Sequence, residues 1–245
     1  MNSGEKGHLH PITQITREIV KIFFELGFEA AEGPELEDEF HNFDALNVPK
    51  DHPARDMQDT FWVKNYYGAD RGNDRPGARS DNRVLRTHTS SVQIRYMESH
   101  KPPFRIIVPG KVFRNEATDA THEAQFYQIE ALYVDKNVSL AHLKGTLEHM
   151  FRSLFGPEVE IRFRPSFFPF TEPSVEVDMR WKGKWLEMGG AGLVNPKVFE
   201  AVKINPEEWR GFAFGFGLDR IAMLKFGFDD VRQLYNGDLR LVNQF

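Results

Sequence analysis

Six strand-like segments fill most of the second half of the chain and constrain its fold more than any other feature. Each is a short run of apolar, β-branched or aromatic residues that ends at a turn signal. They follow one another with only a few helices between them, which favours an antiparallel β-sheet of the α+β class, flanked by α-helices, over repeated βαβ units. The segments are residues 105–114, 126–134, 158–165, 174–180, 184–188 and 211–217.

Three helices are predicted, the first two of them from apolar residues at three- and four-residue steps. The first covers residues 12–26, with Pro11 at its start and Gly27 just past its end. Its apolar stripe must be buried somewhere, which predicts self-association as a homodimer through this helix. The other two cover residues 139–154 and 218–226 and are closed by Gly156 and Gly227.

The 245 residues show no internal repeat and no clear linker, so we expect one domain over residues 1–245. One stretch inside it has a different composition. Residues 65–82 are rich in Gly, Asp, Asn and Arg and have no apolar period. This composition predicts an exposed loop inserted into the domain.

Composition excludes several classes of protein. Without cysteine the chain has no disulfide, thiolate zinc site or cysteine nucleophile, which fits a reducing compartment. No apolar stretch approaches the ~20 residues of a membrane span, and the first residues lack the apolar core of a signal peptide, so we expect a cytoplasmic protein with no membrane partner. The net charge of −5 argues against non-specific binding to a polyanion, so a nucleic-acid partner would need a local patch or a second subunit.

Several nucleotide-binding and metal-binding motifs are incomplete in this sequence. The glycine-rich segments around Gly190 and Gly215 have Asn195 and Arg220 where a dinucleotide-binding loop needs its last glycine. No P-loop motif is present. His122 and the following glutamate begin like a zinc-protease helix, but Phe126 stands where the second histidine would be.

The second strand-like segment has two different faces. Alternate residues of a strand share a face, so Gln128 and Glu130 lie together with Phe126, opposite Ile129 and Ala131. An amide, a carboxylate and an aromatic ring on one face are typical of a ligand-binding sheet. A solvated face of an antiparallel sheet is the alternative, and this stretch alone favours neither.

Two arginines are candidates for binding an anion. Arg114 and Glu116 share a face at the end of the preceding segment, with His122 in the loop that follows; they suit phosphate oxygens and a flat base. A cross-strand ion pair is the alternative. Arg220 falls in the first turn of the last helix, where it opposes the helix dipole, so either a bound phosphate or a surface pair with Asp219 would offset it.

The segment from residue 164 to 180 combines aromatic and acidic side chains. Phe168 and Phe170 flank a proline, Glu172 follows, and Glu176 and Asp178 are expected to face outward. Core aromatics and a solvated acidic face explain this pattern. Carboxylates are also what the Mg²⁺ of an ATP-dependent enzyme requires, so the segment agrees with a nucleotide site.

The order of these features resembles motifs 1, 2 and 3 of the class II aminoacyl-tRNA synthetases. The sequences of five blocks resemble still more closely the family of bacterial phenylalanyl-tRNA synthetase alpha subunits. Five blocks in the right order are far more specific than any one motif. The resemblance runs from about Gly7 to the C-terminus. The blocks are residues 41–62, 85–97, 119–132, 162–178 and 211–220.

The resemblance implies a class II synthetase fold that activates L-phenylalanine with ATP, releases pyrophosphate and passes the amino acid to tRNA(Phe). It implies that ATP is bound by Arg114, Glu116, His122, Phe126 and Arg220, with Arg114, Arg220 and His122 as the catalytic groups. It implies that phenylalanine is bound by Trp62, His88, Ser90, Gln128, Glu130, Phe168, Phe170 and Ala213, and that Glu172 is a magnesium ligand shared with a beta subunit.

The chain also departs from the resembled family. No heptad pattern precedes the first helix, where the family has a coiled-coil arm that grips tRNA, and a beta subunit would have to be another chain. Asp219 stands where the family usually has Glu, and Ala191 where a Cys is common. A non-catalytic paralogue with a regulatory role is the alternative function, but it would be expected to lose Arg114, Arg220 or Glu130. A related ligase with another substrate is a third.

Overall fold

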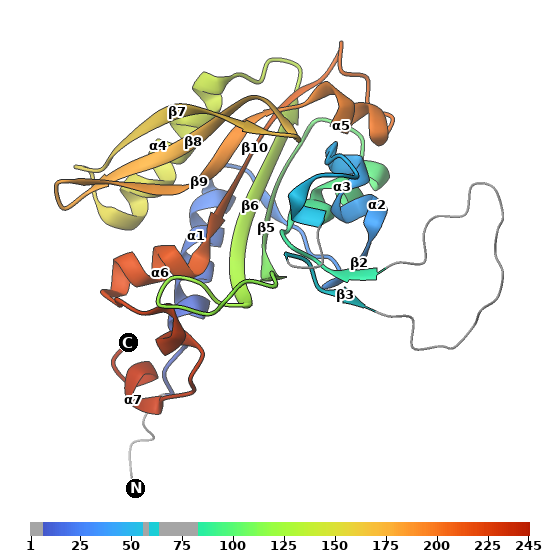
Figure 1. Ribbon diagram of the computed structural model, residues 1–245. Coiled ribbons are helices and arrows are strands. Elements are labelled where there is room, and N and C mark those ends of the chain that lie inside the picture. The colour runs from blue at the N-terminus through green and yellow to red at the C-terminus, as the bar shows by residue number, and fades with distance from the viewer. Residues whose placement is uncertain (1–6, 56–58, 64–82) are drawn as a thin grey trace, which may run out of the picture.

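The computed structural model describes residues 7–55, 59–63 and 83–245. A sheet of seven strands forms its centre, in the order β1-β5-β6-β10-β9-β8-β7 (Figure 1). The α+β class predicted from the sequence is confirmed, and all six predicted strand segments lie in this sheet. The strands are β1 (Glu29–Ala30), β5 (Phe104–Phe113), β6 (Gln125–Asp135), β7 (Glu160–Phe168), β8 (Thr171–Trp181), β9 (Lys184–Val194) and β10 (Arg210–Gly217).

The sheet is mixed, which corrects the expectation of a purely antiparallel one. β1 runs parallel to β5, with Glu29 opposite Ile106, whereas the other neighbours are antiparallel. A parallel pair needs a long crossover connection. Here that connection contains the helices α2 (Glu39–Asn42) and α3 (Ser90–Ser99) and a small sheet of β2 (Leu36–Asp38), β4 (Arg83–Leu85) and β3 (Trp62–Val63).

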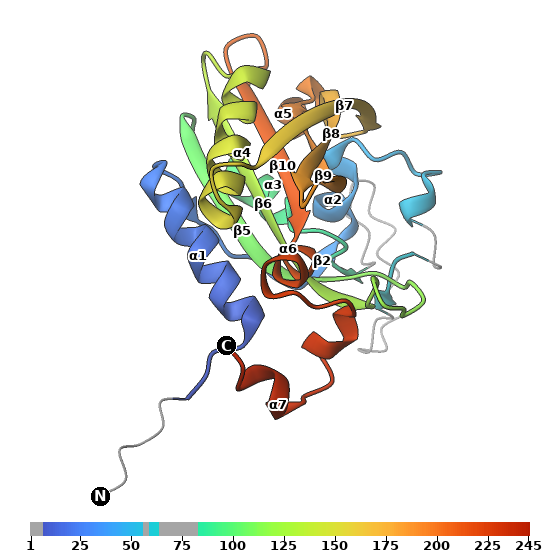
Figure 2. The ribbon, with the colours of Figure 1, turned by 90° about the vertical axis from the view of Figure 1, so that its left-hand side faces the viewer.

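Three helices pack on the other side of the main sheet from α2 and α3 (Figures 1 and 2). These are α1 (Pro11–Glu25), α4 (Leu140–Phe155) and α6 (Leu218–Phe226), and all three were predicted from the sequence. The His10 ring caps α1 by accepting the N–H of Ile12, and Gly227 ends α6 in the left-handed conformation, at φ 84°.

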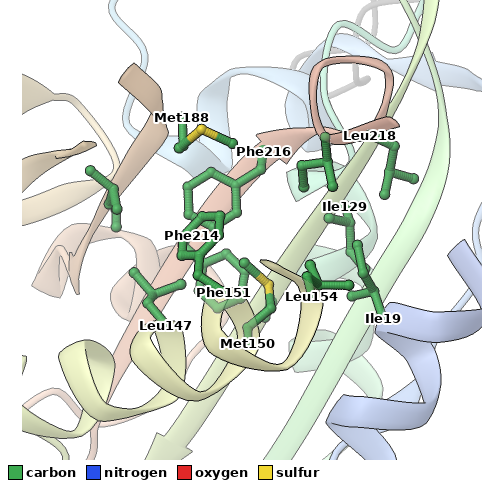
Figure 3. Packing of buried hydrophobic residues seen from close by; sticks show 14 of the residues in the cluster. Ile19, Ile129, Leu147, Met150, Phe151, Leu154, Met188, Phe214, Phe216 and Leu218 are labelled. Atoms are coloured by element: carbon green, nitrogen blue, oxygen red, sulfur yellow. The ribbon is translucent and has the colours of Figure 1, made fainter. Parts of the chain in front are cut away.

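The core between the sheet and these helices is rich in aromatic rings. The rings of Phe151 from α4 and Phe216 from β10 lie 5.4 Å apart between centroids, and Phe214 stacks on Phe216 at 5.1 Å (Figure 3). The α1 stripe packs into the same core, where Ile15 and Ile19 are fully buried and Leu26 is partly buried. The stripe is therefore covered within the chain and does not need a partner helix to bury it.

The glycine-rich end of β9 extends further than the sequence predicted. Residues 189–194 continue the strand, and residues 189–193 pair with β10, with Gly190 opposite Gly215. A Cβ on Gly189 would lie 2.3 Å from the Gly215 carbonyl oxygen, so the two backbones approach too closely for a side chain. The glycines serve this close strand contact.

Several short elements were not predicted. Besides α2, α3 and the small sheet, the chain forms α5 (Pro196–Ala201), α7 (Leu239–Val242) and the 3-10 helices η1 (Asp44–Leu46), η2 (Pro53–Arg55) and η3 (Val231–Leu234). Their sequences are too short or too polar to show a helical period. The predicted loop at residues 65–82 lies outside the described residues.

Candidate active site

A cavity of about 540 Å³ lies against the face of β6 that carries Gln128, Glu130 and Leu132. This volume is in the range of small-molecule sites. Glu130 is only 5% exposed, and Ile129 and Ala131 on the opposite face are fully buried in the core. The polar face of this strand is thus the wall of a cavity.

The Glu130 carboxylate is held at the N-terminal end of α3. It accepts hydrogen bonds from the Thr89 N–H (3.0 Å), the Ser90 hydroxyl (2.5 Å) and the Gln93 side-chain amide (2.8 Å). Burial raises the pKa of Glu130, while these hydrogen bonds and the nearby Arg114 charge favour its ionised form. Gln93 lines the cavity and was not predicted from the sequence. The only signal for it was that a buried Glu130 carboxylate needs hydrogen-bond donors.

Two polar atoms in the cavity wall have no hydrogen-bond partner among the described residues. They are the Gln128 side-chain oxygen and the Nδ1 atom of His88, and both are buried. Burial, and then the charge of Arg114, lower the pKa of His88 to about 3, so its imidazole is neutral at physiological pH. Buried polar groups are costly when unpaired, which makes these two atoms candidates for ligand contacts.

Aromatic rings form one end of the cavity. Phe168 and Phe170 are stacked, with centroids 5.9 Å apart and planes 9° from parallel. A Cβ on Gly190 would lie 2.8 Å from the Phe168 ring, so this glycine provides the space for that ring. Ala213, on β10, lines the cavity beside them, together with the apolar side chains of Leu46, Met97, Leu132, Val194 and Val198.

Arg114 and Phe126 form a pair on the wall formed by the β5–β6 hairpin. The guanidinium carbon lies 5.1 Å from the ring centroid, and the Arg114 Nε donates to the Thr87 carbonyl at 3.1 Å. Burial lowers the pKa of Arg114, and the charges of Glu116 and Glu130 oppose that shift. The Arg114 side chain makes no ion pair within 4.0 Å with any described residue.

Arg220 and His122 line the cavity from two other segments. Arg220 is exposed and makes no hydrogen bond or ion pair with any residue that the structure describes. The surface pair with Asp219 considered above is absent, because Asp219 instead accepts the Tyr127 N–H (2.7 Å) and the Tyr235 hydroxyl. His122 is exposed, and its Nδ1 lies 3.0 Å from Asp119 in the same loop.

The structure brings together all but two of the predicted site residues. Those lining the cavity are His88, Ser90, Arg114, Glu116, His122, Phe126, Gln128, Glu130, Phe168, Phe170, Ala213 and Arg220. Trp62 is not among the lining residues; it stacks on Phe43 at 6.3 Å, and its indole N–H donates to the Arg55 carbonyl. Glu172 is exposed on β8 and also lies outside the cavity wall.

Two other carboxylates take part in the cavity wall on β8 and β9. Glu176 and Glu187 both line it, and the Arg164 guanidinium holds them at 2.8 and 3.1 Å. Sequence reasoning placed Glu176 on an outward face, and Glu187 was missed because nothing in a single short strand marks it.

Comparison with known proteins agrees with this geometry. Residues 1–245 match the family model of the tRNA synthetases class II core domain (F). The chain is similar to the phenylalanine–tRNA ligase alpha subunits of Synechocystis sp. (51% identity, 98% of this chain and 68% of the relative) and Dehalococcoides mccartyi (52% identity, 98% and 70%). It thus spans about two thirds of the length of these relatives.

The chain belongs to the class II tRNA synthetase core family. Within that class, its similarity to the curated relatives places it in the phenylalanine–tRNA ligase alpha subunit family. Among solved structures, pyrrolysyl-tRNA synthetase from Desulfitobacterium hafniense shares the fold, with a TM-score of 0.70 and 17% identity over 93% of this chain and 74% of that one. No helix within the described residues is long and apolar enough to cross a bilayer.

Proposed function

We propose that the chain activates L-phenylalanine with ATP to form phenylalanyl-adenylate and pyrophosphate, and that the amino acid is then transferred to tRNA(Phe). Family membership supports the reaction class, and the names of the relatives support the amino acid. The observation that carries the proposal is a pair of buried atoms, Gln128 Oε1 and His88 Nδ1, that have no partner among the described residues and lie in one cavity with the Glu130 carboxylate.

The cavity offers groups that suit each part of phenylalanine. The ammonium would lie against the Gln128 oxygen and the Glu130 carboxylate, because a buried cation needs an acceptor or a counter-charge. The benzyl ring would lie against the stacked rings of Phe168 and Phe170, with Ala213 leaving room near its far end. Tyrosine adds only a hydroxyl, which an apolar pocket rejects about 10²-fold.

ATP would lie on the side of the cavity formed by the β5–β6 hairpin and α6. Arg114 would contact the α-phosphate, Phe126 and Glu116 would receive the base, and Arg220 and His122 would hold the outer phosphates. Activation forms a bond between a carboxylate oxygen of phenylalanine and the α-phosphorus, and breaks the bond to the bridging oxygen of pyrophosphate. The chain supplies orientation and positive charge for this step and needs no nucleophile of its own.

Magnesium would accompany ATP at this site. Mg²⁺ bound with a nucleotide keeps several waters and takes one or two carboxylates beside the phosphates, so a complete protein cage is unnecessary. Glu176 and Glu187 fit that donor set because both line the cavity. Glu172 remains a prediction; its exposed position on β8 fits a ligand shared with a neighbouring chain.

The assembly and location are further parts of the proposal. The family resemblance favours a beta subunit as the partner. A homodimer through α1 is not favoured, because the apolar stripe of this helix is already covered inside the chain. The proposal includes charging of tRNA(Phe) and a cytoplasmic location, because both belong to a role in protein synthesis.

Phenylalanine-dependent exchange of pyrophosphate into ATP tests the activation step. The purified chain should show exchange, with or without an added beta subunit, and Arg114→Ala should abolish it. A panel of twenty amino acids identifies the substrate, and a preference for another amino acid would reassign it. Phenylalanine binding without ATP binding, measured by calorimetry, would favour the non-catalytic paralogue instead.

A further inference from the structure

The C-terminal segment contacts both elements that carry the expected ligands of the outer phosphates. The N–H of Val231, in η3, donates to the Ala120 carbonyl at 2.8 Å, in the loop between β5 and β6 that also carries His122. The Tyr235 hydroxyl, just after η3, donates to Asp219 in the first turn of α6. Figures 1 and 2 show this segment beside both α6 and the loop.

Asp219 joins three parts of the chain at one carboxylate. One oxygen accepts the Tyr127 N–H at 2.7 Å, at the start of β6, and the other accepts the Tyr235 hydroxyl. The side chain is 5% exposed and has no ion pair with a described cation. A buried carboxylate in this state depends on its hydrogen bonds, so the geometry around it is strongly constrained.

These contacts fix the relative positions of two cavity-lining residues that are expected to bind ATP. Phe126 directly precedes Tyr127, and Arg220 directly follows Asp219. The hydrogen bond between Tyr127 and Asp219 therefore sets the separation of the base-stacking ring from the backbone of Arg220. Arg220 itself has no hydrogen-bond or ion-pair partner among the described residues, so its side chain is placed by the first turn of α6 alone.

A second contact holds the end of η3. The His10 Nε2 donates to the Leu234 carbonyl at 2.9 Å, while Nδ1 of the same ring accepts the Ile12 N–H and caps α1. Tyr235 is thus held between the start of α1 and the start of α6. The Tyr235 hydroxyl binds α6 through Asp219, and η3 binds the loop of His122 through Val231. The segment can therefore hold α6 in a fixed position relative to that loop.

We propose that Tyr235 is a positioning residue for the triphosphate of ATP. Through Asp219 it holds Arg220, and through η3 it holds the loop of His122, so that both cationic groups meet the same β- and γ-phosphates. Tyr235 is not among the residues that line the cavity. This role rests on the proposed function, since it assigns the outer phosphates to Arg220 and His122.

Tyr235→Phe removes only the hydroxyl and tests this role. We expect the dissociation constant for ATP, measured by titration calorimetry, to rise about 10-fold, and the KM for ATP in pyrophosphate exchange to rise by a similar factor. The KM for phenylalanine should change less than 2-fold. Asp219→Asn is a second variant; because the two residues act as one pair, the double variant should bind ATP no more weakly than the worse single one.

Tyr133→Phe is the matched control. Its hydroxyl also donates to a carboxylate, Asp135, but at the far end of β6 from the ATP side. This variant should leave both KM values unchanged. A merely structural role of Tyr235 would lower the melting temperature and leave the ratio of the two KM values unaltered, and that result overturns the proposal.

The measurements separate this role from the function on which it rests. Wild-type chain that binds ATP but shows no exchange would refute activation, while the ATP dissociation constants would still test Tyr235. Wild-type exchange with equal ATP binding by Tyr235→Phe would refute only the positioning role. No ATP binding by the wild-type chain would reject both.

Discussion

The Asn47 side-chain amide donates to the backbone carbonyl of Pro169 at 2.7 Å. Pro169 lies between Phe168 and Phe170 in the sequence, and the rings of these two residues stack in the cavity. Asn47 itself is in the left-handed conformation, at φ 58°, which asparagine and glycine tolerate better than other residues. This single bond connects the turn after η1 to the aromatic end of the site.

Asn47→Asp should weaken phenylalanine binding. It replaces the donor with a carboxylate facing a carbonyl oxygen, at a cost of about 1–2 kcal/mol, or roughly a 5- to 30-fold rise in the KM for phenylalanine. The KM for ATP should stay the same. Asn47→Gly also loses the donor but keeps the backbone conformation accessible, so a normal KM in that variant would show that the amide does not position the rings.

Glu130→Gln should reduce phenylalanine affinity far more than ATP affinity. The change removes the charge and brings a second amide donor towards Gln93. Loss of one partner of a buried charge pair costs about 2–5 kcal/mol, so we expect at least a 30-fold weaker dissociation constant by calorimetry. Equal losses for both ligands would contradict the assignment of Glu130 to the ammonium.

Phenylalanine affinity should also depend on pH through Glu130. Burial raises its pKa, so its carboxylate takes up a proton at a higher pH than an exposed glutamate. The affinity should therefore fall as the pH is lowered towards that raised pKa. Calorimetric titrations over a pH series would measure this, and the fall should be absent in Glu130→Gln.

Asp219 should make the protein less stable as the pH rises. Burial raises its pKa to about 6 from the usual 3.8, so between about pH 4 and 6 the folded state binds a proton that the unfolded state has released. The stabilisation is complete below pH 4 and is lost above pH 6; a shift of about two units corresponds to about 3 kcal/mol. Denaturant unfolding of wild type and Asp219→Asn between pH 4.5 and 8 would show the variant gaining relative stability with pH. A constant difference would contradict this.

Two adjacent glycines of β9 should respond differently to alanine. In Gly189→Ala the new methyl group meets the Gly215 backbone oxygen, which cannot move without disturbing β10, so we expect a loss of about 1–3 kcal/mol in unfolding free energy. In Gly190→Ala it meets the Phe168 ring, which can rotate. That variant should stay folded and show a raised KM for phenylalanine. Melting temperatures and exchange kinetics on both variants would check the contrast.

The sequence predicted those parts of the fold that rest on local periodicity and on caps. The helix at residues 218–226 has the predicted limits because Gly227 ends it. In contrast, α3 begins with Ser90 and Ser91 and mixes polar and apolar residues, so it shows little periodicity. Its role appears only once Glu130, far along the chain, accepts its N-terminal donors.

The site was predictable where a motif carries its residues and not where folding brings distant segments together. Arg114 and Arg220 were found in separate motifs, and the structure places both on one cavity. Tyr235 and Asn47 act across distances in sequence that no local pattern reveals. The family resemblance assigned Trp62 to the phenylalanine site, whereas in the structure its ring stacks on Phe43.

The parallel pairing of β1 with β5 determines how the amino acid pocket can assemble. The edge strand has only two residues, and the chain between it and β5 includes the helix whose N-terminal groups hold Glu130. Closing this segment carries an entropic cost, and β1 pairs with β5 at only two register positions to offset it. We therefore expect α3 and the small sheet to form after the central strands have paired, and their amides to exchange with solvent sooner than those of β6 and β10.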